Sequence, residues 1–74
     1  MLSPDTFALV DAALHAQEDE RRQAFSIHNA ALDELTSSLP AEELVELFEL
    51  LRLGDPARRE LGARLLSSRM LEAR

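Results

Sequence analysis

Residues 4–38, PDTFALVDAALHAQEDERRQAFSIHNAALDELTSS, contain no glycine, and their single proline stands at the first position. This composition favours a helix throughout the stretch. As one helix, the stretch would be about 52 Å long at 1.5 Å per residue. A compact globule of 74 residues has a radius of gyration of only about 11 Å. The chain therefore either breaks inside this stretch or presents a long helix that another molecule must cover.

An apolar stripe with helical spacing runs along both ends of this stretch and is interrupted in the middle. The stripe has the alternating three-and-four spacing of a coiled-coil seam, and its members are Phe7, Val10, Leu14, Gln17, Arg21, Ala24, His28, Ala31 and Leu35. Residues 15–23, HAQEDERRQ, are almost wholly polar, and a helix that is polar all round either bridges solvent or breaks. Because residues 15–23 contain no Gly, Pro, Asn or Ser, we expect one long or gently kinked helix over 4–38. A break around 17–22 is the alternative.

Capping signals at both ends of this stretch fix where the first helix begins and where it stops. Ser3 is a preferred N-cap, and Pro4 suits the first helical position. The sequence Ser-Ser-Leu-Pro at 37–40 ends the helix, because the residue before a proline disfavours helix.

The remaining sequence predicts two shorter helices. The first covers 40–53, with Pro40 at its first position and Gly54 as a left-handed C-cap. Asp55 and Pro56 then begin a helix over 56–72, in which Gly62 indicates a close approach to another helix. We therefore expect an all-α fold of three helices in a single domain, 1–74, with the long N-terminal helix packed against a C-terminal helical hairpin.

Some apolar residues have no place in such a core, and they predict a homodimer. On the second helix, one broad apolar face is expected to pack inward, and it comprises Leu44, Val45, Leu47, Phe48 and Leu51. Leu50 and Leu53 lie opposite that face, and Leu66 and Met70 belong to a second apolar stripe on the third helix. Soluble monomers rarely leave a large apolar patch exposed, and two-fold dimers are the commonest way to cover one. We expect these four residues to form a dimer or partner surface.

The net charge of −6 is divided unevenly along the chain. Residues 1–55 hold twelve acidic residues and three arginines, a net of −9, whereas residues 56–74 hold five arginines and two glutamates, a net of +3. An acidic body repels phosphates and membrane surfaces and favours a partner with a basic surface. We expect the basic end to neutralise the acidic helices beside it, and contact with phosphate is the alternative.

Composition also excludes several classes of protein. Cysteine is absent, which excludes disulfides and thiolate metal sites. No apolar stretch approaches the ~20 residues that a membrane span needs, and the first residues lack the features of a signal peptide. These observations predict a cytoplasmic protein that does not interact with membranes.

The sequence offers little material for catalysis. It has no Cys, Lys or Tyr nucleophile and no glycine-rich phosphate loop. His15 has Asp11, Glu18 and Asp19 at helical spacings of three or four, but ligands from a single helix face are more typical of a solvated surface than of a metal site. His28 lies in the seam as an interface residue, with a pH-sensitive contact as the alternative. We therefore predict no catalytic residue, cofactor or metal.

The charged centre of the first helix is the predicted partner-binding site, and it comprises Glu18, Asp19, Arg21 and Arg22. These residues contribute almost nothing to the expected core, and arginine is enriched at interface hot spots. The alternative is a solvated charged patch. A helix-turn-helix interpretation, in which Arg58, Arg59 and Arg64 contact DNA, fits poorly, because it needs a small residue where Leu50 stands and an apolar one where Glu60 stands.

About the last 40 residues also carry a resemblance. The resemblance rests on Leu32-Asp33-Glu34-Leu35, Leu39-Pro40, Asp55-Pro56-Ala57-Arg58 and Leu61. This pattern resembles the helical docking segments at the ends of modular polyketide synthase subunits, which implies a docking or assembly module. The general look is also that of small acidic inhibitors and antiactivators of phages and plasmids. We expect a non-enzymatic regulator or inhibitor that covers a surface of a larger protein, with a docking module as the first alternative and a small DNA-binding regulator as the second.

Overall fold

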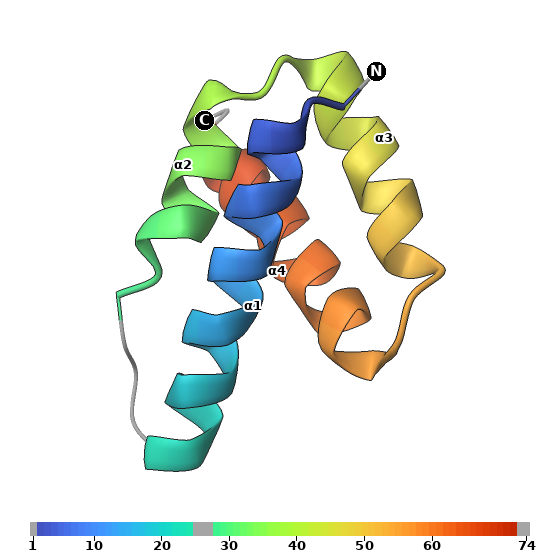
Figure 1. Cartoon of the computed structure of the whole chain (residues 1–74). Helices are drawn as coiled ribbons and strands as arrows, with labels where there is room; N and C mark the ends of the chain where they lie inside the picture. The colour runs from blue at the N-terminus through green and yellow to red at the C-terminus, as the bar shows by residue number, and fades with distance from the viewer. Residues whose placement is uncertain (1, 25–27, 73–74) are drawn as a thin grey trace.

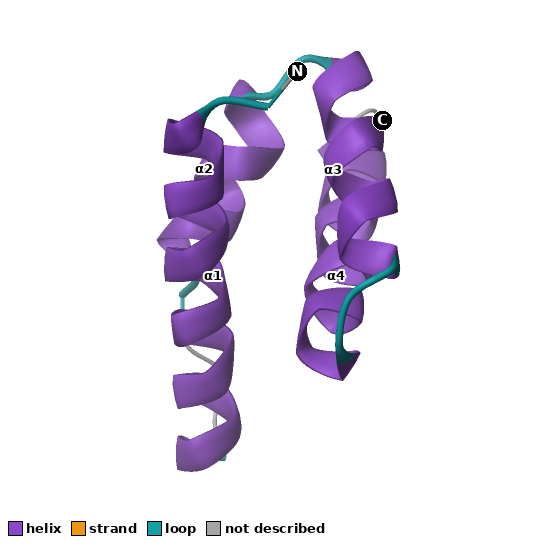
Figure 2. Cartoon of the chain, turned by 45° about the vertical axis from the view of Figure 1, so that its right-hand side comes forward, coloured by secondary structure: helices purple, strands orange, loops and turns teal. Residues whose placement is uncertain are grey.

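The computed structural model describes residues 2–24 and 28–72, with the side chains of 70–72 outside that description. The described residues form four helices and no strand: α1 (Pro4–Gln23), α2 (Ala30–Ser38), α3 (Ala41–Arg52) and α4 (Pro56–Glu72). Figures 1 and 2 show two antiparallel pairs, α1 with α2 and α3 with α4, which pack on each other. The helix α4 contacts all three others, and the chain has a radius of gyration of 11.6 Å. The fold is therefore all-α and compact.

The expectation of one helix over 4–38 is wrong, because the chain turns back between α1 and α2. Ala24 ends α1 in the left-handed conformation, with φ of 58°, and its N–H donates to the Glu20 carbonyl. Asn29 begins α2, since its Oδ1 accepts from the Leu32 N–H at 3.1 Å. The Asn29 Nδ2 group also donates to the Ala13 carbonyl of α1 at 3.1 Å. The break thus falls after the charged stretch and not at 17–22.

The helix α1 begins as its sequence predicts but buries a different stripe. The Ser3 side chain accepts from the Thr6 N–H at 3.2 Å, and Pro4 stands in the first turn. The buried positions are Thr6, Val10, Ala13 and Gln17, whereas Phe7 of the predicted seam is exposed. A straight 3-4 seam suits one long partner helix, and α1 packs instead on two helices of its own chain, α2 and α4.

The connection between α3 and α4 differs in detail from the prediction. Pro40 is the N-cap of α3 and not its first residue, and Leu53 at the other end keeps right-handed geometry. Gly54 has no positive φ, so the predicted left-handed cap is wrong. Its missing side chain leaves space instead, because a Cβ there would lie 2.9 Å from Cδ of Arg58. The predicted cap of α4 is present: Asp55 Oδ1 accepts from the Arg58 N–H at 2.9 Å.

The core consists mainly of leucines from α2, α3 and α4. The buried apolar residues are Val10, Ala13, Leu32, Leu35, Leu39, Leu44, Leu47, Leu51, Leu61 and Leu65. Leu61 and Leu65 of α4 and Leu35 of α2 are completely inaccessible. Gly62 lets α4 approach α3 closely, since a Cβ there would lie 3.2 Å from the Leu51 Cβ. The core is thus centred on α4, with α2 and α3 against different parts of its surface.

This close approach predicts that a large side chain at position 62 destabilises the protein. Gly62→Leu should lower the free energy of unfolding by roughly 1–3 kcal/mol, as overpacking of a filled site does, although leucine is the better helix former. Ala63→Leu, at the exposed position next to Gly62, should change the free energy of unfolding by less than about 0.5 kcal/mol. Urea unfolding monitored by circular dichroism measures both. Equal stability of the two variants would contradict the close packing of α3 on α4.

Candidate functional site

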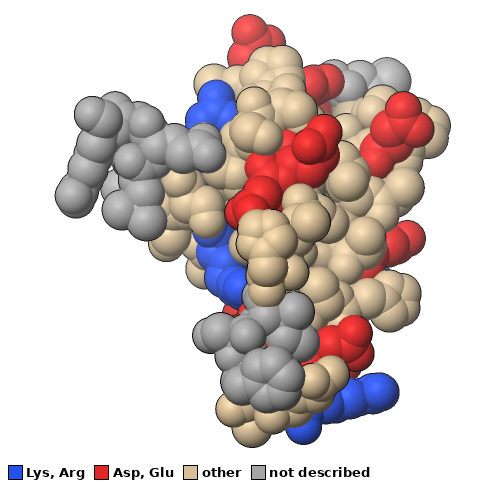
Figure 3. Space-filling model, turned by 90° about the vertical axis from the view of Figure 1, so that its left-hand side faces the viewer, with Lys and Arg blue, Asp and Glu red and all other residues tan. Residues whose placement is uncertain are grey.

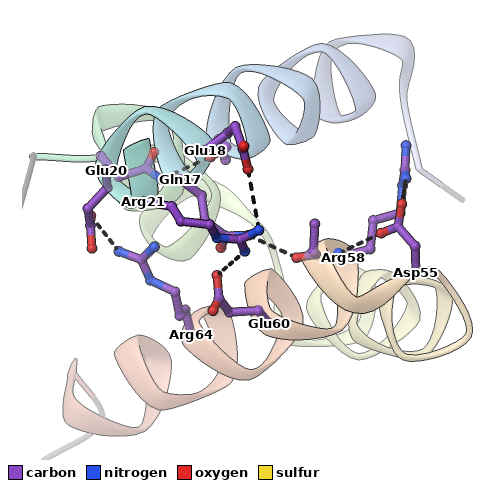
Figure 4. A network of polar contacts seen from close by, with 11 residues as sticks. Gln17, Glu18, Glu20, Arg21, Asp55, Arg58, Glu60 and Arg64 are labelled. Atoms are coloured by element: carbon purple, nitrogen blue, oxygen red, sulfur yellow. Dashed lines mark hydrogen bonds and ion pairs between the residues drawn. The ribbon is translucent and has the colours of Figure 1, made fainter. Parts of the chain in front are cut away.

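Two of the four predicted partner-binding residues of α1, Glu18 and Arg21, form contacts within the chain. The Arg21 guanidinium lies 3.6 Å from a Glu60 carboxylate oxygen on α4 and 3.4 Å from Glu18 on its own helix. Glu20 forms a second bridge to α4, 3.6 Å from Arg64 (Figure 4). The charged centre of the first helix is therefore one half of a polar seam between α1 and α4.

Gln17 is the buried residue of this seam. It is only 3% exposed, and its Nε2 donates to the Ala57 carbonyl at the start of α4 at 2.9 Å. Its Oε1 is the one buried side-chain polar atom in the described residues that lacks a hydrogen-bond partner. The expectation that this stretch contributes almost nothing to the core is thus wrong at Gln17. Asp19 and Arg22 are exposed, and Arg22 lies 3.9 Å from Glu18 of its own helix.

Three arginines of α4 contact groups within the chain, and two of them, Arg64 and Arg69, join α4 to another helix. Arg58 pairs with Asp55 at 2.9 Å, and Arg64 pairs with Glu20. Arg69 donates from Nη1 to the Thr36 and Leu39 carbonyls, at 2.7 and 3.0 Å, at the end of α2. A cation is favourable there, because the C-terminus of a helix carries partial negative charge and α2 has no basic residue in its own last turn.

Arg64 of the basic end thus pairs with an acidic residue of α1, whereas Arg69 binds backbone carbonyls at the end of α2. Much of the remaining surface is acidic. Figure 3 shows acidic side chains spread over the face that carries α2, with fewer basic ones between them.

A shallow hollow of about 510 Å³ lies between the start of α2 and the middle of α4. Its lining includes His28, Asp33, Glu60, Arg64 and Ser67. His28 lies 3.3 Å from Asp33, and both side chains are well exposed to solvent. The hollow also contains the buried side chain of Asn29, but both amide atoms of that residue are already used in the fold. It therefore lacks the buried, convergent polar groups that are typical of a catalytic pocket.

His15, which has acidic neighbours on α1, makes a contact within its own helix. His15 Nδ1 lies 3.0 Å from the Asp11 carbonyl on the same helix, exposed to solvent. Within residues 2–24 and 28–72, no group of three His, Asp or Glu side chains is placed to hold a metal ion. No helix in this part of the chain is both long and apolar enough to cross a membrane.

One helix presents a surface of exposed apolar and acidic side chains together. We call it the α3 outer face, and its members, all exposed, are Glu42, Val45, Glu46, Glu49, Leu50 and Leu53. Val45, Leu50 and Leu53 are 61%, 49% and 77% exposed. They are three of the five large apolar residues that are exposed in the described chain, and Phe7 and Leu66 are the others. Such a concentration on one helix marks a candidate contact surface.

The sequence located part of this surface and missed the rest. Leu50 and Leu53 were predicted to lie outside the core, and they do. Val45 was placed on the inner face but lies at its solvent-exposed edge, because α3 buries a narrower stripe of Leu44, Leu47 and Leu51. Leu66, 40% exposed, lies on α4, and the Met70 side chain lies outside the described residues.

The geometry of the polar seam predicts how Gln17 contributes to stability. Gln17→Met keeps the volume and removes the unpaired oxygen, so its free energy of unfolding should stay within about 1 kcal/mol of the original or rise. Gln17→Ala leaves a cavity and should cost roughly 1–3 kcal/mol. Thermal and urea unfolding of both variants measure this. If methionine costs as much as alanine, the polar contacts of Gln17, including its bond to the Ala57 carbonyl, outweigh its packing volume, which would contradict this expectation.

Comparison with known proteins gives no family for this fold and surface. No protein-family model, curated protein or solved structure matches the chain. The resemblance to polyketide synthase docking segments therefore rests on the residues that carry it. The α3 outer face is the candidate functional site that the geometry itself provides.

Proposed function

We propose that this protein is not an enzyme and acts by binding another protein, as a regulator or inhibitor that covers a surface of a larger partner. The observation that carries the proposal is the α3 outer face. A small core has few large apolar side chains to spare, yet Val45, Leu50 and Leu53 face solvent. Full burial of an exposed Val or Leu side chain against a partner contributes on the order of 1.5–3 kcal/mol to binding.

The character of the other surfaces supports binding over catalysis. The hollow beside α2 is shallow, and its histidine, which precedes α2, pairs with an exposed carboxylate of that helix. The partner we expect has a basic surface, because the chain carries fourteen acidic residues against eight arginines. Among the candidate hot spots of α1, Asp19 and Arg22 are exposed and available as a second contact, whereas Glu18 and Arg21 also serve the seam with α4.

Two alternatives use the same surface. A docking or assembly module would join its partner into a complex without inhibiting it. A homodimer would cover Leu50 and Leu53 with a second copy of this chain. The third alternative, a small DNA-binding regulator, has less support, because two of its three predicted DNA contacts, Arg58 and Arg64, pair with acidic side chains within the chain, whereas Arg59 is exposed.

Affinity purification of the tagged full chain from its native cells, followed by mass spectrometry, tests the proposal. We expect one larger protein to co-purify above a control bait, an unrelated helical protein of similar size and net charge. The purified partner should then bind the chain at a defined stoichiometry by calorimetry and lose its own activity.

Each alternative gives a different result in that experiment. A partner that stays fully active in the complex would favour the docking module. Sedimentation equilibrium of the pure chain at micromolar concentration would show a species of twice 8.3 kDa if the homodimer forms. If no protein co-purifies above the control bait and the chain sediments as a monomer, the proposal is wrong.

A further inference from the structure

We propose that the α3 outer face binds a basic amphipathic helix of the partner. This inference rests on the proposed function and adds the surface and the chemistry of what it binds. The six members of the face recur at helical spacings of three and four, so they form one continuous band along the helix. Figure 1 shows α3 at the edge of the molecule, with no helix on its outer side.

The charge of α3 selects a cationic partner. The helix carries Glu42, Glu43, Glu46 and Glu49 against the single basic residue Arg52, a net of −3. Arg52 is already held by Glu49, with Nη2 2.6 Å and Nε 3.2 Å from the same carboxylate oxygen. A second copy of this chain would bring two such acidic helices together, and nucleic acid or an anionic membrane would bring phosphate against them. All three are disfavoured by like-charge repulsion, whereas lysines and arginines are attracted.

The arrangement of the apolar residues fits a helix better than an extended peptide. Val45 and Leu53 are eight residues apart, about 12 Å along the helix, and Leu50 stands between them. A partner helix laid along α3 reaches all three with its own residues at spacings of three and four. Its flanking basic residues then lie beside the glutamates. An extended peptide binds mainly by pairing with a sheet edge, and the described residues contain no strand.

A synthetic helical peptide is the probe that tests this surface directly. We would use an 18-residue peptide with leucines at positions i, i+3, i+4 and i+7 and lysines on the remaining face, titrated into the ¹⁵N-labelled full chain. One control peptide has the same composition with the leucines scattered around the helix, and another carries glutamate in place of lysine. We expect saturable shifts of the α3 amides with the first peptide and weaker binding, by about tenfold or more, with both controls.

Matched variants distinguish binding at the α3 outer face from attraction to the acidic charge of the whole chain. Leu53→Asp should weaken binding of the peptide by about tenfold, since it removes the most exposed apolar contact, whereas Leu66→Asp on α4 should not. Glu42→Lys with Glu49→Lys should also weaken binding, and Asp11→Lys with Glu34→Lys, the same change in net charge at exposed residues outside this face, should leave it within about twofold. Circular dichroism checks that each variant keeps its helicity.

Several results would overturn this inference. Equal loss of affinity in the two double charge variants would show attraction to acidity alone. Unchanged binding by Leu53→Asp would exclude the apolar contact, and α3 shifts that grow with protein concentration without peptide would show that a second copy occupies the face. A purified natural partner that binds the Leu53→Asp and Glu42→Lys/Glu49→Lys variants normally would leave the proposed function intact and refute this surface. Absence of any partner, with the peptide still bound at α3, would instead count against the proposed function.

Discussion

The hydrogen bonds of the Asn29 side chain hold the N-terminal half of the chain, α1 and α2, in its folded shape. One amide atom caps α2, and the other reaches the Ala13 carbonyl in the middle of α1. The two helices therefore lie side by side instead of end to end. Leu32 and Leu35 of α2 can then join Val10 in the same core, over α4. A buried amide that is satisfied on both sides also sets the register of the two helices, since a shift would leave it unpaired.

The rest of the fold follows from that turn. Because α1 and α2 pair, they form one layer, and α4 packs beneath both of them while α3 packs on α4 (Figure 2). The interface of α1 with α4 is polar where α1 leaves the core, through Gln17, Arg21 and Glu20. Arg69 fixes the other end of α4 to the last carbonyls of α2. Two basic residues of α4, Arg64 and Arg69, are thereby partly buried. The outer surface of α3, which has one arginine, stays acidic, and this is the charge that we propose a partner recognises.

Local signals in the sequence were enough to predict several parts of this structure. The caps at Ser3 and Asp55, the helix that begins at Pro56, the close approach at Gly62 and the exposure of Leu53 all depend on near neighbours or on helical spacing. The break after Gln23 could not be read in the same way. Ala24 adopts a left-handed conformation that alanine rarely takes, so its residue type gave no sign of a helix end. Asn29 was a signal within reach, because asparagine is a preferred N-cap.

The candidate site was predictable to a smaller extent, for the same reason. Helical spacing alone predicts the exposure of Leu50 and Leu53. The exposure of Val45 depends on which side of α3 faces α4, and that orientation is set by the packing of the two helices. The sequence predicts that Glu18 and Arg21 are available to a partner, because nothing in it shows that Arg21 meets Glu60 of α4. The polar character of a residue says little about which helix it meets, and that information comes only from the packed fold.

The claim that the chain turns back at Asn29 has one direct measurement. In an isotope-filtered nuclear Overhauser experiment, which separates contacts within one chain from those between copies, the Asn29 side-chain amide protons should show cross-peaks to backbone protons around Ala13. The structure places the Asn29 nitrogen 3.1 Å from the Ala13 oxygen. In a continuous helix the two residues would be about 24 Å apart. Absence of these cross-peaks, together with unbroken helical signals through residues 24–29, would contradict the account.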